Sequence, residues 1–133
     1  LGVATISPII SKRVQNRNLN HDKINLCLTE ASEQCERFDI PQLHQAISLQ
    51  EFLSQNSYDQ IIFCNEYEQR KKINDYNLRD NICILTGPEG GFSEQEVELI
   101  MSYDNICSVQ ICSNILRAET AIIAVLSQVH LVR

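Results

Sequence analysis

Three of the four glycines in this 133-residue chain lie within five consecutive positions, 87–91. They belong to the stretch Leu-Thr-Gly-Pro-Glu-Gly-Gly-Phe-Ser at 85–93, which follows the apolar run 82–85 and precedes an amphipathic segment. This order predicts a strand, a glycine-rich turn and a helix. Because glycine tolerates a positive φ and lets a ligand approach the main chain, we expect a ligand-binding loop or an unusual backbone path. The plain alternative is a tight turn without a ligand.

Short apolar runs alternate with helical patterns along the rest of the chain. Buried strands that alternate with helices predict an α/β fold with a mostly parallel sheet flanked by helices. Ligands of such sheets bind beyond the carboxyl ends of the strands. The strands are expected near 4–9, 60–64, 81–85 and 106–111, the helices over 22–37, 49–55, 93–103 and 119–129, and an exposed loop or loose helix at 66–77.

Local signals mark several of these helices. Ser93 and Glu96 fit a capping box, in which the two side chains bond each other's main-chain N–H groups. The last helix, 119–129, is apolar nearly all round, so we expect one side to face the sheet and the other to face a second subunit. The helix over 22–37 is predicted from an apolar stripe of Ile24, Cys27, Leu28, Ala31 and Cys35.

The composition limits the class of protein. A chain with 44% hydrophobic and 21% charged residues is typical of one globular domain with its own core. No run approaches the roughly 18 apolar residues of a membrane span, and the N-terminus lacks signal-peptide features and an initiator methionine. We therefore expect part of a longer, cytoplasmic protein.

The net charge of −6 disfavours strong nucleic-acid binding by this chain alone, so an RNA partner would require a local basic patch or a further module.

The six cysteines contain no C-x-x-C pair, and the three histidines do not cluster with them. This spacing disfavours a zinc site or a disulfide framework. Cys64 and Cys83 lie in apolar, strand-like runs, where cysteine behaves as a small hydrophobic residue. We therefore predict reduced, buried thiols and no bound metal. A metal or redox protein is the alternative, which metal analysis would test.

The two loops at the expected strand ends carry the chemistry. A phosphate-binding loop would need Gly-Lys-Ser/Thr, and Glu89 would repel phosphate, so a neutral or cationic ligand suits 87–91 better.

A second stretch, Ile-Leu-Arg-Ala-Glu-Thr-Ala at 115–121, opens the last helix. Arg117 flanks an almost wholly apolar helix, which favours a role at a cleft or an interface. The alternative is a capped helix with a surface arginine, since Glu119 suits the helix dipole and Thr120 can hydrogen-bond locally.

Together, the Gly-Pro-Glu-Gly-Gly-Phe-Ser and Ile-Leu-Arg-Ala-Glu-Thr-Ala motifs resemble the SPOUT methyltransferases, and among them the bacterial 16S rRNA (uracil-N3)-methyltransferase family (RsmE). Residues 1–13 and the E-Q-x-x-R…P pattern at 33–41 are similar to that family as well. The resemblance implies methylation of uridine N3 in 16S rRNA from S-adenosylmethionine, a C-terminal trefoil knot and a homodimer. It also implies that 1–133 is the catalytic domain, without the family's N-terminal PUA-like RNA-binding domain and possibly without the start of the catalytic domain.

The resemblance assigns roles to single residues. Arg117 is the expected catalytic residue, because a fixed guanidinium can stabilise negative charge on the uracil oxygens. Glu119 is a candidate general base, with helix capping as the alternative role, and no base is otherwise identified. The expected cofactor-binding residues are Cys64, Leu85, Thr86, Gly87, Pro88, Glu89, Gly90, Gly91, Ile111, Cys112, Ser113, Asn114, Ile115 and Leu116. The candidates for RNA contacts are Arg13, Glu33, Gln34, Arg37, Glu119 and Thr120.

One residue departs from the family pattern. Cys112 stands where the family usually has glycine, and if this position required a positive φ, the strain would be about 1 kcal/mol. The Cys112 side chain would also crowd the cofactor. Two alternatives therefore stay open: a catalytically impaired SPOUT module that binds the cofactor, or a SPOUT methyltransferase that acts on another RNA or on protein.

Overall fold

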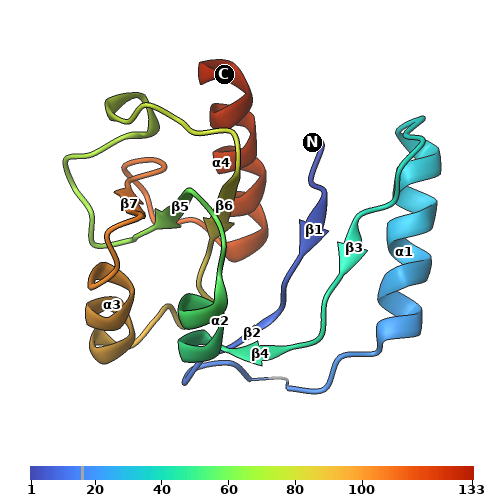
Figure 1. Ribbon diagram of the computed structural model, residues 1–133, viewed down its shortest axis with the longest axis horizontal. Helices are drawn as coiled ribbons and strands as arrows, with labels where there is room; N and C mark the ends of the chain where they lie inside the picture. The colour runs from blue at the N-terminus through green and yellow to red at the C-terminus, as the bar shows by residue number, and fades with distance from the viewer. Residues whose placement is uncertain (16) are drawn as a thin grey trace.

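The computed structural model describes residues 1–15 and 17–133 and has an α/β fold in which all paired strands are parallel (Figure 1). The helices and strands predicted at 49–55, 60–64, 81–85, 93–103, 106–111 and 119–129 are confirmed to within a few residues. The elements are β1 (Thr5–Ile6), β2 (Ile9–Ile10), α1 (His21–Gln34), β3 (Gln42–Leu43), β4 (Ile47–Ser48), α2 (Leu49–Gln55), β5 (Gln60–Cys64), the 3₁₀ helix η1 (Ile73–Asp75), β6 (Ile82–Leu85), α3 (Glu94–Met101), β7 (Ile106–Val109) and α4 (Ala118–Val132).

The central sheet has three strands in the order β6-β5-β7. In its register, Ile61 of β5 pairs with Cys83 of β6 and with Ile106 of β7. Successive side chains of β5 point to opposite faces, and Ile61, Ile62 and Phe63 are all buried. This burial on both faces explains why β5 is a continuous apolar run in the sequence.

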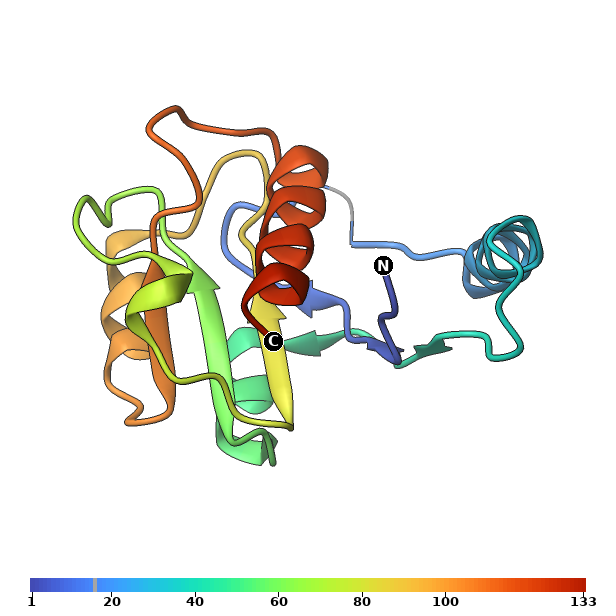
Figure 2. The same cartoon turned by 90° about the horizontal axis from the view of Figure 1, so that it is seen from above.

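Helices cover both faces of this sheet (Figures 1 and 2). On one face, Phe52 and Leu53 of α2 and Ile100 of α3 pack in one core cluster with Ile61 and Phe63 of β5. On the other face, Val125 and Val129 of α4 pack with Ile62, Cys107 and Val109. The segment 66–77, predicted as an exposed loop or loose helix, is mostly exposed and contains η1, but η1 buries Ile73 in this second cluster.

The last helix is buried on one side only. Val125 and Val129 of α4 face the sheet, whereas Ile122 and Ile123 are 40% and 59% exposed and Leu131 is 85% exposed. The side that we expected to face a second subunit is therefore open in the single chain. Among the described residues, no helix combines the length and the apolar character needed to cross a membrane.

The N-terminal part forms two short parallel pairs, β1 with β3 and β2 with β4. The strand predicted at 4–9 is broken at Ser7 and Pro8, since proline has no N–H to give to a strand partner. Strands β3 and β4 were not predicted, because two residues are too few to show an alternating pattern.

Helix α1 stands apart from the central sheet (Figure 2). Its C-terminal end is joined to the N-terminal segment by Arg37, whose Nη2 donates to the Val3 carbonyl at 3.1 Å. The apolar stripe predicted for this helix is not a buried face: Cys27 is exposed and only Ser32 of the helix is buried. Periodicity predicts that a helix has an apolar side, but it does not predict which element covers that side.

All six cysteines are free thiols, as predicted, but they are not all buried. Cys107 is buried and Cys64 and Cys83 are partly buried in the sheet, whereas Cys27, Cys35 and Cys112 are exposed, so the prediction of burial is wrong for these three. The exposed thiols lie on α1, at its end and in a loop, where no second layer packs over them. In the described part of the chain, no three His, Cys, Asp or Glu side chains come together as a metal site.

Candidate active site

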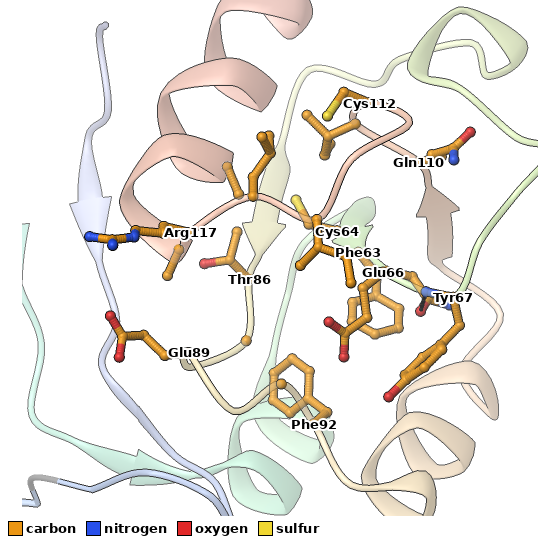
Figure 3. Close-up of a pocket in the computed structure, with 18 of the residues that line it drawn as sticks. Phe63, Cys64, Glu66, Tyr67, Thr86, Glu89, Phe92, Gln110, Cys112 and Arg117 are labelled. Atoms are coloured by element: carbon orange, nitrogen blue, oxygen red, sulfur yellow. Dashed lines mark hydrogen bonds between the residues drawn. The ribbon is translucent and has the colours of Figure 1, made fainter.

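The loops that follow β5, β6 and β7 enclose a cavity. Because the three strands are parallel, the chain leaves Cys64, Leu85 and Val109 at the same edge of the sheet. The cavity between these loops has a volume of about 490 Å³, which is within the range of small-molecule sites (Figure 3). The start of α4 completes the lining through Ala118 and Ala121.

The glycine-rich loop is fixed by the helix that follows it. The predicted capping box is confirmed: Ser93 Oγ accepts the Glu96 N–H at 3.3 Å, and Glu96 Oε2 accepts the Ser93 N–H at 2.8 Å. Within the loop, Gly91 donates its N–H to the Pro88 carbonyl at 2.8 Å and has a φ of 65°. A Cβ at Gly91 would also overlap the carboxylate of Glu66. The φ of Gly91 therefore favours glycine, and a side chain at this position would have to displace the Glu66 carboxylate.

A segment from the N-terminal part braces this loop from outside. Arg13 Nη1 donates to the Gly90 carbonyl at 2.8 Å, and Glu96 Oε1 accepts the Lys12 N–H at 2.7 Å. Burial by itself would raise the pKa of Glu96, but the N–H donors of Ser93 and Lys12 stabilise its carboxylate, so its pKa is lowered. Arg13, predicted as an RNA contact, therefore supports the loop through its side chain.

The second loop runs from Gln110 to Arg117. Its start is fixed by the Gln110 N–H, which donates to the Lys71 carbonyl at 2.8 Å, and by Gln128 Nε2, which donates to the Ile111 carbonyl at 3.0 Å. Among the described residues other than glycine, only Glu36 has a positive φ, so Cys112 does not meet the condition under which strain was expected. Instead, the Cys112 thiol donates to the Asn114 carbonyl at 2.9 Å.

Main-chain groups of the second loop are available to a ligand. Within the described residues, five N–H groups that line the cavity have no protein hydrogen-bond partner. They belong to Ile111, Cys112, Ser113, Ile115 and Leu116. Because polar main-chain groups need partners when a ligand covers them, these N–H groups are suited to hold the edge of a heterocyclic ring.

Carboxylates and an arginine lie around the same cavity. Figure 3 shows the Glu66 carboxylate directed into the cavity, with Glu89 and Arg117 toward one side and Gln110 and Tyr67 toward the other. The Arg117 guanidinium is exposed and makes no hydrogen bond to the described part of the protein. Burial raises the pKa of the Cys64 thiol to about 12, so this side chain is neutral in the cavity wall.

Most residues predicted for the cofactor lie in this lining. Leu85 and Gly90 do not: Leu85 is buried in the core, and Gly90 lies outside, against Arg13. Arg117 lines the cavity as well. The prediction missed the segment that directly follows β5, although its place at the carboxyl end of a central strand could have indicated it. The lining residues that were not predicted are Phe63, Asn65, Glu66, Tyr67, Phe92, Val97, Gln110, Ala118 and Ala121.

The predicted RNA contacts are not brought together. Glu119 and Thr120 are exposed in the first turn of α4, outside the cavity lining. Glu33 and Gln34 are exposed at the end of α1, which is well separated from the cavity (Figure 1). Arg37 is paired with Asp39 at 2.6 Å, and its hydrogen bond lowers the pKa of that carboxyl group.

The lining fits S-adenosylmethionine, which has an apolar ring system and a cationic end. Phe63, Ile111 and Leu116 give apolar walls, and the free N–H groups of the second loop can pair with ring nitrogens. The carboxylates of Glu66 and Glu89 can attract a sulfonium or an ammonium group. This agrees with the sequence-based expectation of a neutral or cationic ligand.

The chain is similar to proteins named ribosomal RNA small subunit methyltransferase E. It is 39% identical to that of Rickettsia conorii, a match that covers 98% of this chain and 55% of the relative. It is 31% identical to that of Aquifex aeolicus, over 96% of this chain and 56% of the relative. The chain thus spans just over half the length of these relatives.

A solved structure agrees with the sequence matches. The structure of ribosomal RNA small subunit methyltransferase E from Neisseria gonorrhoeae, bound to S-adenosyl methionine, superimposes with a TM-score of 0.84 at 27% identity. That match covers 97% of this chain and 55% of the other. The sequence model that describes the RNA methyltransferase domain matches residues 1–130 of this chain. From this match over nearly its whole length, we conclude that the chain belongs to the RNA methyltransferase domain family.

Proposed function

We propose that this chain is the catalytic domain of an enzyme that methylates uridine N3 in the 16S rRNA of the small ribosomal subunit, with S-adenosylmethionine as methyl donor. The relatives are named as small-subunit rRNA methyltransferases, and one is bound to this donor. The observation that carries the proposal is the cavity at the carboxyl end of the sheet, with unpartnered N–H groups on one loop and Arg117 at its edge.

Two loops would hold the cofactor. Main-chain groups at 86–91 and 111–116, with the side chains of Ile111 and Leu116, would bind the adenosine part. Glu66 would attract the cationic part. The bound cofactor supplies an electrophilic methyl group. The chain's own contribution is to position the acceptor, since a displacement of this kind depends mainly on the alignment of donor and acceptor.

Arg117 is the residue that we assign to the substrate. Uracil N3 carries a proton at neutral pH, and negative charge develops on the flanking oxygens when that proton is lost. The Arg117 guanidinium keeps its charge and offers a planar set of donors to these oxygens. Because no described group bonds it in the free protein, it is available to the base. We assign no general base.

The open face of α4 supports a homodimer. Ile122 and Ile123 expose apolar surface on this helix, and Ile115 is 81% exposed in the second loop beside the cavity. Burial of this surface by a second copy would stabilise the dimer and close the site from one side. Replacement of Ile123 with Asp places a charge on this surface, so the variant should sediment as a monomer in analytical ultracentrifugation. A variant that still sediments as a dimer would contradict this arrangement.

Three further features remain proposals. The relatives are nearly twice as long as the matched region, which supports an additional RNA-binding domain of PUA-like type in the whole protein. A trefoil knot would be formed by the second loop and α4. The six free thiols support a reducing, cytoplasmic location.

The proposal is tested by binding and then by transfer. Calorimetry should show heat on addition of S-adenosylmethionine, and label from its methyl group should enter small-subunit RNA, with mass spectrometry of nucleosides identifying 3-methyluridine. Heat without transfer would favour a catalytically impaired module. Transfer only to another RNA or to protein would favour a different SPOUT enzyme, and absence of heat would overturn the proposal.

A further inference from the structure

The loop between β5 and η1 carries three consecutive basic residues, Arg70, Lys71 and Lys72. This is the longest run of basic residues in a chain whose net charge is −6. All three residues are exposed. These residues follow the carboxyl end of β5, so their loop starts at the same edge of the sheet as the loops that form the cavity. We name Arg70, Lys71 and Lys72 the basic run.

Main-chain hydrogen bonds hold the basic run in one conformation. Glu68 Oε1 accepts the N–H groups of Gln69, Arg70 and Lys71 at 3.1, 3.0 and 3.3 Å. Asp75 Oδ2 accepts the Lys72 N–H at 2.8 Å. In the described part of the chain, the carboxylates of Glu68 and Asp75 are therefore bonded to the main chain of the run and make no ion pair with its side chains.

Within the described residues, the side chains of the basic run have no ion-pair partner. The structure as described, which omits residue 16, has one ion pair, and it joins Arg37 to Asp39. Lys71 Nζ instead lies 5.8 Å from the centre of the Tyr76 ring, whose hydroxyl donates to the Ser108 carbonyl at 3.0 Å. The three positive charges are exposed on one loop, and such a group attracts polyanions.

The basic run is joined directly to the cavity. The Lys71 carbonyl accepts the N–H of Gln110, and Gln110 lines the cavity. A second hollow lies between Lys72, Gln110 and Cys112 and reaches the C-terminal end of α4. A strand of nucleic acid that places a base in the cavity could thus lay its backbone across this hollow.

We propose that Arg70, Lys71 and Lys72 bind phosphates of the RNA whose base enters the cavity. This inference rests on the proposed function and adds to it the surface that receives the RNA backbone. Phosphate contacts position an RNA without reading its sequence, and they depend on salt because each one releases bound counterions. In an acidic chain, such a run supplies the local attraction that net charge cannot.

The test is the salt dependence of RNA binding by the whole protein. Dissociation constants for an unmodified small-subunit rRNA transcript would be measured over a series of KCl concentrations, for the parent and for Arg70→Gln/Lys71→Gln/Lys72→Gln. The logarithm of the association constant falls linearly with the logarithm of the salt concentration, with a slope of about −0.7 per phosphate contact on single strands. Loss of three contacts should therefore make this slope less steep by about 2. The dissociation constant at low salt should rise about tenfold or more.

A matched control separates the basic run from net charge. The variant Arg17→Gln/Lys23→Gln/Arg79→Gln removes the same number of exposed positive charges near α1 and before β6. Its slope should stay near that of the parent. Equal slopes for the parent and the basic-run variant, or equal losses in both variants, would overturn the inference.

Cofactor binding and RNA binding, measured on the same variants, separate the role of the basic run from the proposed function. The affinity for S-adenosylmethionine, measured by calorimetry, should be the same in the parent and in both variants, which also shows that the variants are folded. If the parent binds the cofactor but no RNA, the proposed function fails. If the parent binds and methylates RNA and the basic-run variant does so equally well, only the assignment of the basic run fails.

Discussion

The carboxylate of Glu96 accepts the main-chain N–H of Lys12 at 2.7 Å, although 84 residues separate the two in the sequence. The other oxygen of Glu96 caps α3 through the Ser93 N–H. One side chain therefore fixes the helix start, and with it the glycine-rich loop, to the N-terminal segment. Since Arg13 adds a bond to the Gly90 carbonyl, the loop is held from both of its sides.

Replacement of Glu96 with Ala should lower the free energy of unfolding by about 2 kcal/mol, because two N–H groups lose a charged acceptor. Glu96 is only 7% exposed, so water can replace its carboxylate only in part. Urea denaturation followed by circular dichroism would measure the change. Glu98→Ala is the matched control, since Glu98 is exposed on the same helix and is not part of the capping box. Equal stabilities of the two variants would contradict this role of Glu96.

The elements with strong local patterns could be predicted from the sequence. Strands β5, β6 and β7 are mostly apolar, and the Ser93–Glu96 capping box defines the start of α3. The Glu96–Lys12 bond could not be predicted, because no local pattern relates residues so far apart. Two-residue strands such as β3 and β4 likewise depend on their tertiary partners rather than on their own sequence.

The candidate site could be predicted where a loop carries a motif. All positions at 86–91 and 111–116 that line the cavity were predicted, and Gly90 was predicted but does not line it. Glu66 and Tyr67 were missed because their segment has no distinctive composition, and only the strand order β6-β5-β7 places it beside both motif loops. The condition for strain at Cys112, a positive φ, is not met, because a family preference for glycine does not determine φ in this chain.

Substitution of Gly91 with Ala should weaken cofactor binding and destabilise the protein. A φ of 65° costs a residue with a Cβ about 1–2 kcal/mol, and the new methyl group would displace Glu66 from the cavity. Calorimetric titration with S-adenosylmethionine would measure the loss. Gly90→Ala is the control, because its φ is not positive and its Cβ would meet the nearest atom, Arg13 Cβ, at 3.4 Å. A Gly91→Ala variant that binds as tightly as Gly90→Ala would refute the close packing of Glu66 on the loop.

The thiols should differ in reactivity. Burial raises the pKa of Cys64 to about 12 and that of Cys83 to about 11, so at pH 8 both remain protonated and unreactive. Iodoacetamide should therefore label the exposed Cys27 and Cys112, as mass spectrometry of peptides would show. Saturating S-adenosylmethionine should protect Cys112, which lines the cavity, and leave the labelling of Cys27 unchanged. Unprotected Cys112 in the bound protein would place the cofactor elsewhere.

The loop that carries the basic run should loosen in acid. The N–H group of Arg70, helped by the Lys71 N–H, the Ser108 hydroxyl and the Gln69 N–H, outweighs the effect of burial and holds the pKa of Glu68 below its ordinary 4.5. A lowered folded-state pKa means that the carboxylate stabilises the fold above pH 4.5, and that this contribution disappears as pH falls through the lower value. The amide resonances of Arg70 and Lys71 should shift with a midpoint below 4.5. A midpoint at or above 4.5 would contradict these hydrogen bonds.

Replacement of Arg117 with Gln should separate chemistry from cofactor binding. Gln keeps a polar side chain of similar reach but lacks the positive charge, so stabilisation of charge on the uracil oxygens is lost and turnover should fall about 100-fold or more. Affinity for S-adenosylmethionine should change little, because the Arg117 guanidinium makes no bond that shapes the described cavity walls. Single-turnover methyl transfer and calorimetry would give the two quantities separately. Arg13→Gln is an informative comparison: its guanidinium supports the Gly90 carbonyl, so this change should weaken cofactor binding first. An Arg117→Gln variant with normal turnover, or with cofactor affinity reduced as strongly as its turnover, would show that Arg117 does not act on the base.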